Sequence, residues 1–163
     1  LESFEKSYNI LINGTGKILD TLTDDSLNQS VTDDHRTLGR MAWHIITTIP
    51  EMMGAIGLKV TTVAKEAPLP KSADEIRKSY RAVTAELLEQ IKKSWTDETL
   101  FKIDDLYGEK WPRGLTLKIL TDHEIHHRGQ MTVLMRQAGL PVPGVFGPSK
   151  EEWSNYGGQP PAI

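Results

Sequence analysis

The chain has 163 residues, 38% of them apolar and 25% charged, with a net charge of −3, which predicts one globular domain over residues 1–163. The absence of cysteine excludes disulfides, a thiolate nucleophile and cysteine-ligated metals, and the absence of a basic stripe argues against nucleic-acid binding. Because no apolar run approaches the roughly 18 residues that span a membrane and no signal peptide is recognised, we expect a cytoplasmic protein without membrane contact.

Apolar residues recur at helical spacing in the first part of the chain. One stripe runs over about residues 2–22, and a second runs over about residues 36–58, whose start Asp33 or Asp34 is expected to cap. The linker of residues 59–71 contains two prolines and carries no such stripe. The pattern predicts two long helices followed by an irregular connection.

A third helical stripe begins with the sequence SADE, in which Ser72 and Glu75 are spaced as a capping box, and it continues to Ile91. The connection from Trp95 to Gly114 is irregular. It contains the sequence DLYGEKW, whose glycine predicts a turn within a small hairpin.

The fourth helical stripe covers about residues 115–137 and ends before Gly139 and Pro141. Ser149 followed three positions later by Glu152 predicts one further short helix near the C-terminus. Four amphipathic helices without a long strand predict an all-α fold, a four-helix bundle with a short extra C-terminal helix.

The fourth helix contains the sequence DHEIHHRGQM, in which His123 and His127 are one turn apart. Stepping about 100° per residue places these two side chains about 40° from each other, on a largely apolar stripe that includes Leu120. On the same wheel, Glu124 and Arg128 lie outside the stripe and are expected to point to solvent or a neighbouring helix. Two imidazoles side by side suit two ligands of one metal ion, and core histidines bonded to other side chains are the alternative.

A metal ion requires a further ligand from another part of the chain, for which His35, His44 or a carboxylate are candidates. We expect an exposed or capping role for His35, at the start of the second helix. His44 is the best candidate, although it lies on the flank of its apolar stripe, because it is the only interior histidine of another predicted helix. Imidazole ligands suit zinc, nickel, iron or copper, and we expect a divalent ion, foremost zinc, nickel or iron.

The sequence His123-Glu124-x-x-His127 also matches the zinc-binding motif of metalloproteases. The longer metzincin motif continues with a glycine and a third histidine, but Gln130 stands at the glycine position and no histidine follows. The chain also lacks a predicted sheet edge that could bind an extended peptide. We therefore expect a different kind of metal site.

With LGRMAWHI in the second helix and HEIHHRGQM in the fourth, the sequence resembles the DinB superfamily, the DinB/YfiT-like proteins. The likeness extends over most of the chain, including the order of the helices and the FGPSKEEW tail. It implies an up-down-down-up four-helix bundle, often a homodimer, whose metal ligands are one histidine of the second helix and two of the fourth. In this sequence these are His44, His123 and His127.

The resemblance leaves the role of Glu124 open. The remaining motif residues are expected to pack around or support the ligands: His126, Arg128, Gly129 and Gln130. Characterised members of the superfamily include S-transferases and isomerases that use a low-molecular-weight thiol such as bacillithiol or mycothiol. The resemblance therefore implies a metal-dependent S-transferase with a small-molecule substrate and a thiol cosubstrate.

Two other functions are compatible with a metal on three histidines. One is hydrolysis of a small ester, amide or lactone, in which the metal activates water. The other is a non-catalytic metal-binding stress protein. An open pocket lined by apolar residues beside the histidines would count against the non-catalytic alternative.

Overall fold

The fold, described here for residues 1–162 from a computed structural model, is dominated by four long α-helices. Their bounds are α1 (Glu2–Asp20), α2 (Leu38–Ala55), α3 (Ala73–Ser94) and α4 (Arg113–Gln137). The shorter elements are the 3-10 helices η1 (Asp25–Asn28), η2 (Asp97–Phe101) and η3 (Lys150–Tyr156) and the strands β1 (Ile103–Leu106) and β2 (Glu109–Pro112). This confirms the predicted all-α fold.

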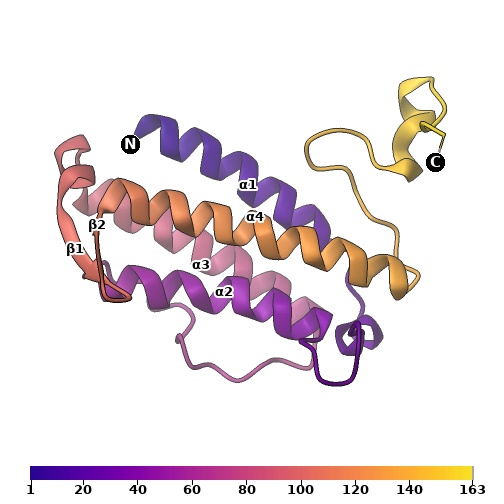
Figure 1. Cartoon of the computed structure of the whole chain (residues 1–163), viewed down its shortest axis with the longest axis horizontal. Coiled ribbons are helices and arrows are strands. Elements are labelled where there is room, and N and C mark those ends of the chain that lie inside the picture. Colours follow the sequence, from indigo (N-terminus) through magenta and orange to yellow (C-terminus); the bar gives the residue numbers. More distant parts are fainter. Residues whose placement is uncertain (163) are drawn as a thin grey trace.

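The four long helices form an up-down-down-up bundle (Figure 1). α2 runs back along α1, residues 56–72 return to the end of the bundle at which α2 began, and α3 then runs parallel to α2. α4 runs in the direction of α1 and packs against both α1 and α2. The long linker therefore leaves α2 and α4, which are not consecutive in the chain, as neighbours.

The first turns of two helices are capped by side chains. Thr37 accepts a hydrogen bond from the N–H of Arg40 at 3.1 Å, so Thr37 caps α2 and the prediction of Asp33 or Asp34 was wrong. The two aspartates lie in the preceding loop, where Asp34 accepts hydrogen bonds from Thr32 and His35. At α3, the predicted Ser72 side chain is the cap.

The predicted hairpin is confirmed as the antiparallel pair β1 and β2. Tyr107 and Gly108 have φ values of 57° and 82°. A two-residue hairpin turn of type I′ requires positive φ at both of its central residues. Arg113, the first residue of α4, donates to Asp104 in β1 at 2.7 Å and to the Ile56 carbonyl beyond α2 at 2.7 Å. This mostly buried ion pair fixes the start of α4 beside the end of α2.

The linker between α2 and α3 is held to the bundle by side chains. The Glu86 carboxylate in α3 accepts hydrogen bonds from the backbone N–H and hydroxyl groups of both Thr61 and Thr62. The indole of the buried Trp43 donates to the Ala67 carbonyl at 2.8 Å. The linker is therefore anchored at two points to the helices that it joins.

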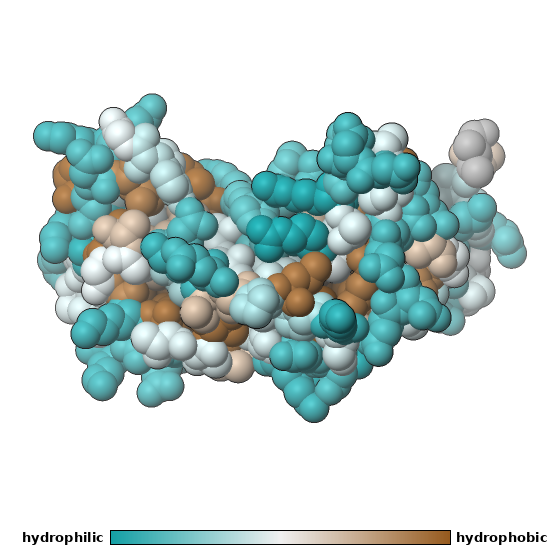
Figure 2. Space-filling model, turned by 90° about the horizontal axis from the view of Figure 1, so that it is seen from below, coloured by the Kyte–Doolittle hydropathy of each residue, from teal (hydrophilic) through white to brown (hydrophobic). Residues whose placement is uncertain are grey.

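The C-terminal segment forms the predicted short helix as η3, where the Glu152 carboxylate accepts from the Ser149 N–H at 3.2 Å and from the Gly144 N–H at 3.0 Å. Within residues 1–162, none of the helices has the length and apolar character needed to cross a membrane. Seen from below, the surface is largely hydrophilic, with apolar patches between the polar side chains (Figure 2).

Candidate metal centre

Three histidines from two helices meet where α2 and α4 face each other. His44 lies in α2, and His123 and His127 lie one turn apart in α4. The Nε2 atom of His123 lies 3.1 Å from Nε2 of His44 and 3.2 Å from Nε2 of His127. One ring nitrogen of each histidine lies within 4.8 Å of the other two. The structure thus brings together the three residues that the sequence predicted as ligands.

The spacing of these nitrogens fits a metal ion. Bonds from imidazole nitrogen to zinc are about 2.0–2.1 Å long, so two such nitrogens on a tetrahedral ion lie about 3.3 Å apart. The observed Nε2 distances of 3.1 Å and 3.2 Å are close to this value. Three nitrogen donors without a carboxylate or thiolate suit zinc, nickel, iron or copper, as predicted.

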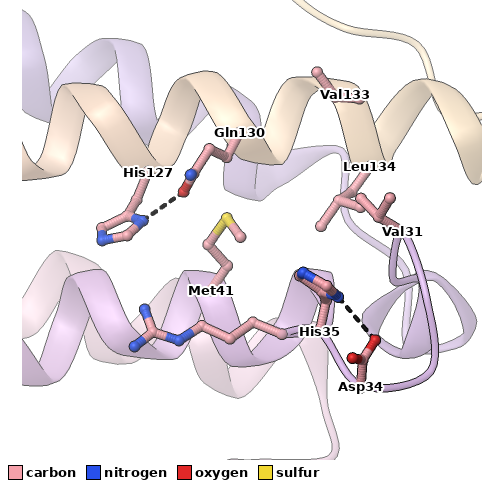
Figure 3. A pocket seen from close by; sticks show the side chains of 9 residues that line it. Val31, Asp34, His35, Met41, His127, Gln130, Val133 and Leu134 are labelled. Carbon is pink, nitrogen blue, oxygen red and sulfur yellow. Dashed lines mark hydrogen bonds and ion pairs between the residues drawn. The ribbon is translucent and has the colours of Figure 1, made fainter.

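A hydrogen bond fixes the ring orientation of His127. Its Nδ1 lies 2.7 Å from Oε1 of Gln130, one turn further along α4 (Figure 3). Because the amide oxygen can only accept, Nδ1 carries the proton and the lone pair of Nε2 faces the other histidines. Metal-bound histidines commonly have such a partner on the other ring nitrogen. Gln130 therefore orients the ring of His127, a candidate ligand.

The surroundings of the triad favour the neutral imidazole, which is the form that binds metals. Burial lowers the pKa of His44 and of His123 to about 4, with further lowering by nearby positive charge. Burial also lowers the pKa of His127, although its hydrogen bond to Gln130 opposes the shift. At neutral pH, protons therefore compete little for these nitrogens.

A pocket of about 500 Å³ opens beside the triad, with His127 in its wall. Figure 3 shows His127 and Gln130 on α4 facing Met41 on α2 across this space. The apolar part of the wall is formed by Val31, Met41, Val133 and Leu134. Local sequence patterns do not predict this pocket, because it arises from the packing of the loop before α2 against α4.

Two histidines outside the triad have other surroundings. His35 is exposed in the loop before α2, as expected, where its Nδ1 lies 2.9 Å from Asp34 Oδ1. His126 is also exposed, with its ring centroid 5.0 Å from that of His127. Neither residue belongs to the cluster that could hold a metal ion.

Glu124 lies in the core of the bundle and contacts two neighbouring helices, which is one of the two surroundings expected for it, whereas its expected place outside the apolar stripe was wrong. Its side chain is only 2% exposed. Its Oε1 atom accepts hydrogen bonds from Thr15 of α1 at 2.6 Å and from Tyr80 of α3 at 2.5 Å. Burial raises the pKa of the Glu124 carboxyl, while these hydrogen bonds and the charge of Arg128 oppose the shift. The carboxylate therefore connects three helices inside the bundle.

Arg128, one turn beyond Glu124, is also buried, and its Nη1 lies 3.2 Å from the Thr15 hydroxyl. The predicted stripe was centred on His123, which placed Glu124 and Arg128 about 100° and 140° away from its centre. The apolar core residues of α4 lie within about 80° of Glu124 on the wheel. They are Leu117, Leu120, Met131, Leu134 and Met135. The histidines occupy the edge of this buried face, where α4 meets α2.

The fold and the site define a class of protein, a four-helix bundle with a candidate three-histidine metal site between its second and fourth helices. The sequence model of the DinB family matches residues 12–161. The chain therefore belongs to the DinB family, which confirms the resemblance found in the sequence.

Relatives from Bacillus agree with this assignment. The uncharacterized protein YrdA of Bacillus subtilis is 43% identical over 163 residues, covering 100% of this chain and 98% of its own. The crystal structure of a DinB-like protein from Bacillus cereus superposes with a TM-score of 0.86 at 46% identity, covering 90% of this chain and 97% of that chain. The structure of the DinB-like protein YjoA from Bacillus subtilis is similar in fold, with a TM-score of 0.65 at 21% identity. The match covers 84% of this chain and 97% of that chain.

Proposed function

We propose that this DinB family member is a metal-dependent enzyme that transfers a low-molecular-weight thiol to an electrophilic small molecule. His44, His123 and His127 would hold the divalent ion. The observation that carries the proposal is the convergence of three imidazole nitrogens, with His127 also in the wall of an open pocket of about 500 Å³. Three protein ligands leave coordination positions for outside molecules, as in catalytic sites.

The apolar wall of the pocket favours a catalytic over a purely metal-binding role. Met41, Val133 and Leu134 contribute carbon surface to the same pocket wall as His127, and the carboxylate in that wall, Asp34, is not part of the candidate metal cluster. Ligand sites in enzymes are commonly built in this way, with apolar walls and a few polar groups. These side chains would bind the carbon skeleton of a substrate and limit the access of water to it.

In the proposed reaction, a bound divalent ion supplies electrostatic stabilisation that lowers the pKa of a thiol. The thiol sulfur forms a bond to the electrophilic carbon of the substrate. The leaving group departs with the electron pair of the broken bond, and the thiol proton passes to solvent. Because the chain has no cysteine, the sulfur must come from a cosubstrate.

The position of Glu124 supports a reaction other than metalloprotease hydrolysis. A metalloprotease uses the glutamate of this motif as a general base beside the metal. Here Oε1 of Glu124 accepts from Thr15 and Tyr80 in the core, and Glu124 is not among the residues that line the pocket. The chain's own residues would therefore bind and orient the reactants, with the base supplied by solvent.

The experiment that tests this function combines metal analysis with a conjugation assay. The purified protein is loaded with zinc, nickel or iron and mixed with a small thiol and the general electrophile 1-chloro-2,4-dinitrobenzene. We expect thioether formation above the uncatalysed rate, lost in His44→Ala and His127→Ala and retained in His126→Ala. No conjugation by the metal-loaded protein, while another DinB-like S-transferase conjugates under the same conditions, would refute the proposal.

Two further outcomes decide between the alternatives. Hydrolysis of a small ester that proceeds without thiol and disappears in His44→Ala would identify the protein as a metal-dependent hydrolase. Full metal content without either reaction would identify a metal-binding protein. The homodimer expected from the resemblance stays a prediction, which light scattering of the purified protein tests.

A further inference from the structure

The pocket beside the triad contains one arginine whose charge is not neutralised within the protein. Arg36 lies in the loop immediately before α2 and lines the pocket together with Met41 and His127. Within residues 1–162, its guanidinium forms no ion pair and no hydrogen bond to another side chain or to the backbone. It is exposed at the pocket, where it can contact a bound molecule.

The loop that carries Arg36 is held in place by its own hydrogen bonds. The Leu38 N–H donates to the Gln29 carbonyl at 2.7 Å, and the His35 N–H donates to the Thr32 carbonyl at 3.1 Å. Thr37, next to Arg36, caps α2. The backbone beside the pocket is therefore fixed at both ends of the loop, which positions the arginine in advance of binding.

The carboxylate in the same pocket does not neutralise Arg36. Asp34 accepts hydrogen bonds from Thr32 Oγ1 at 2.6 Å and from His35 Nδ1 at 2.9 Å. These two contacts, the first being the stronger influence, lower the pKa of Asp34. Figure 3 shows Asp34 at the end of the pocket away from His127. The negative charge is thus engaged within its own loop.

The wall of the pocket contains both Arg36, whose charge has no partner among residues 1–162, and His127 of the triad. A divalent ion on three neutral imidazoles would add two positive charges. The site is therefore electrostatically suited to an anionic ligand.

We propose that the molecule reaching the triad through this pocket is a small organic anion. Its carboxylate pairs with the guanidinium of Arg36, and its aliphatic part lies against the wall formed by Met41, Val133 and Leu134. Arginine binds carboxylates through two parallel hydrogen bonds, which gives orientation as well as affinity. This inference rests on the proposed function and adds to it the charge of the substrate and the residue that recognises it.

The test compares two thiols of equal size that differ in one charge. 3-Mercaptopropionate and 3-mercaptopropionamide are titrated calorimetrically into the metal-loaded full chain, into Arg36→Gln and into Arg40→Gln. Arg40 is a matched control, because it is also exposed and also acts on His44 but does not line the pocket. Any effect of an arginine on the thiol group is shared by both ligands and cancels in the ratio of their dissociation constants.

We expect the acid to bind roughly tenfold more tightly than the amide, which is the size of a charge-assisted hydrogen-bond contribution. The ratio of the dissociation constants of amide and acid should stay near ten in Arg40→Gln and fall to about one in Arg36→Gln. A ratio near one for the unmodified protein, or an unchanged ratio in Arg36→Gln, would overturn the inference. Metal content and thermal unfolding of each variant establish that the fold and the triad are unchanged.

A second ligand pair separates this inference from the thiol chemistry. If the protein binds metal but neither thiol, the thiol part of the proposed function fails. 4-Methylpentanoate and 4-methylpentanamide are then compared on the same three proteins. A preference for the acid that is lost only in Arg36→Gln would support the anion site without the thiol reaction, and equal binding of the two would reject it.

Discussion

The Nε2 atoms of His44 and His123 lie 3.1 Å apart, although 79 positions separate the two residues in the sequence. Their side chains project from different helices, α2 and α4, and His127 completes the cluster from the next turn of α4. A contact between residues this distant depends on the whole bundle. Changes at the triad are therefore expected to affect metal binding, and changes in the core are expected to affect both metal binding and folding.

A metal bound to the triad should stabilise the folded chain. A ligand that binds only the folded state at 100 times its dissociation constant stabilises by about 2.7 kcal/mol. For a domain of this size, that corresponds to a rise in Tm of roughly 5–10 °C. We expect this rise on adding zinc or nickel to metal-free protein, measured by calorimetry, and its loss in His44→Ala. An equal rise in His44→Ala would place the metal elsewhere.

The stability of the metal-free protein should depend on pH through the triad. His44 and His123 have a pKa of about 4 in the folded state, against 6.5 as the ordinary value for the unfolded chain. Between these values the unfolded state binds more protons, so the free energy of unfolding falls as the pH drops from 6.5 towards 4. Above pH 6.5 and below pH 4 these two residues do not make the free energy of unfolding depend on pH.

Urea unfolding midpoints at several pH values across this window measure the effect. The double variant His44→Gln/His123→Gln removes both titrating groups and should show a smaller decrease of stability between pH 6.5 and 4. The same decrease in the double variant would assign the pH dependence to other groups.

Removing Glu124 should destabilise the core. Glu124→Ala leaves the hydroxyls of Thr15 and Tyr80 without their acceptor and leaves Arg128 buried without a nearby negative charge. Breaking a buried charged network in this way costs about 3–5 kcal/mol. Chemical unfolding should show this loss, with a smaller loss in Glu124→Gln, which retains an acceptor oxygen.

The same substitutions test the role of Glu124 in the reaction. Asp122→Ala is the matched control, because Asp122 is an exposed neighbour on α4. If Glu124 is structural, Glu124→Gln keeps its metal and its thiol-transfer rate within a few fold. A loss of rate by several orders of magnitude in a folded, metal-loaded Glu124→Gln would instead identify it as a catalytic base.

Glu86 should control the attachment of the linker between α2 and α3. Its carboxylate accepts from both Thr61 and Thr62, and Glu86→Ala leaves four donor groups without this acceptor. We expect a loss of about 1–3 kcal/mol in unfolding free energy and faster proteolytic cleavage within residues 59–71. Glu89→Ala, an exposed glutamate of the same helix, should show neither effect.

Much of the fold could be predicted because its signals are local. Helical spacing located the four long helices, Ser72 marked the start of α3, and the glycine of DLYGEKW marked the hairpin turn. The cap of α2 was missed because Asp33, Asp34 and Thr37 are all good caps, and only the path of the loop decides among them.

The site could be predicted only in part. The spacing of His123 and His127 indicated a metal site, and the resemblance to a family identified His44 as the third ligand. Helical spacing places Glu124 on the same face of α4 as the apolar core residues, but it does not show the hydrogen bonds to Thr15 and Tyr80, which come from two other helices. The same holds for Arg36, which reaches the pocket only through the packing of its loop against α4.

The placement of the triad on the second and the last of the four long helices also sets the order in which the site can form during synthesis. His44 emerges early from the ribosome, but its two partners belong to the last long helix, 79 and more positions later. α1, α2 and α3 can begin to pack before those partners exist, and only the docking of α4 closes both the core around Glu124 and the triad. Acquisition of metal by the nascent chain would therefore report that assembly of the bundle is complete.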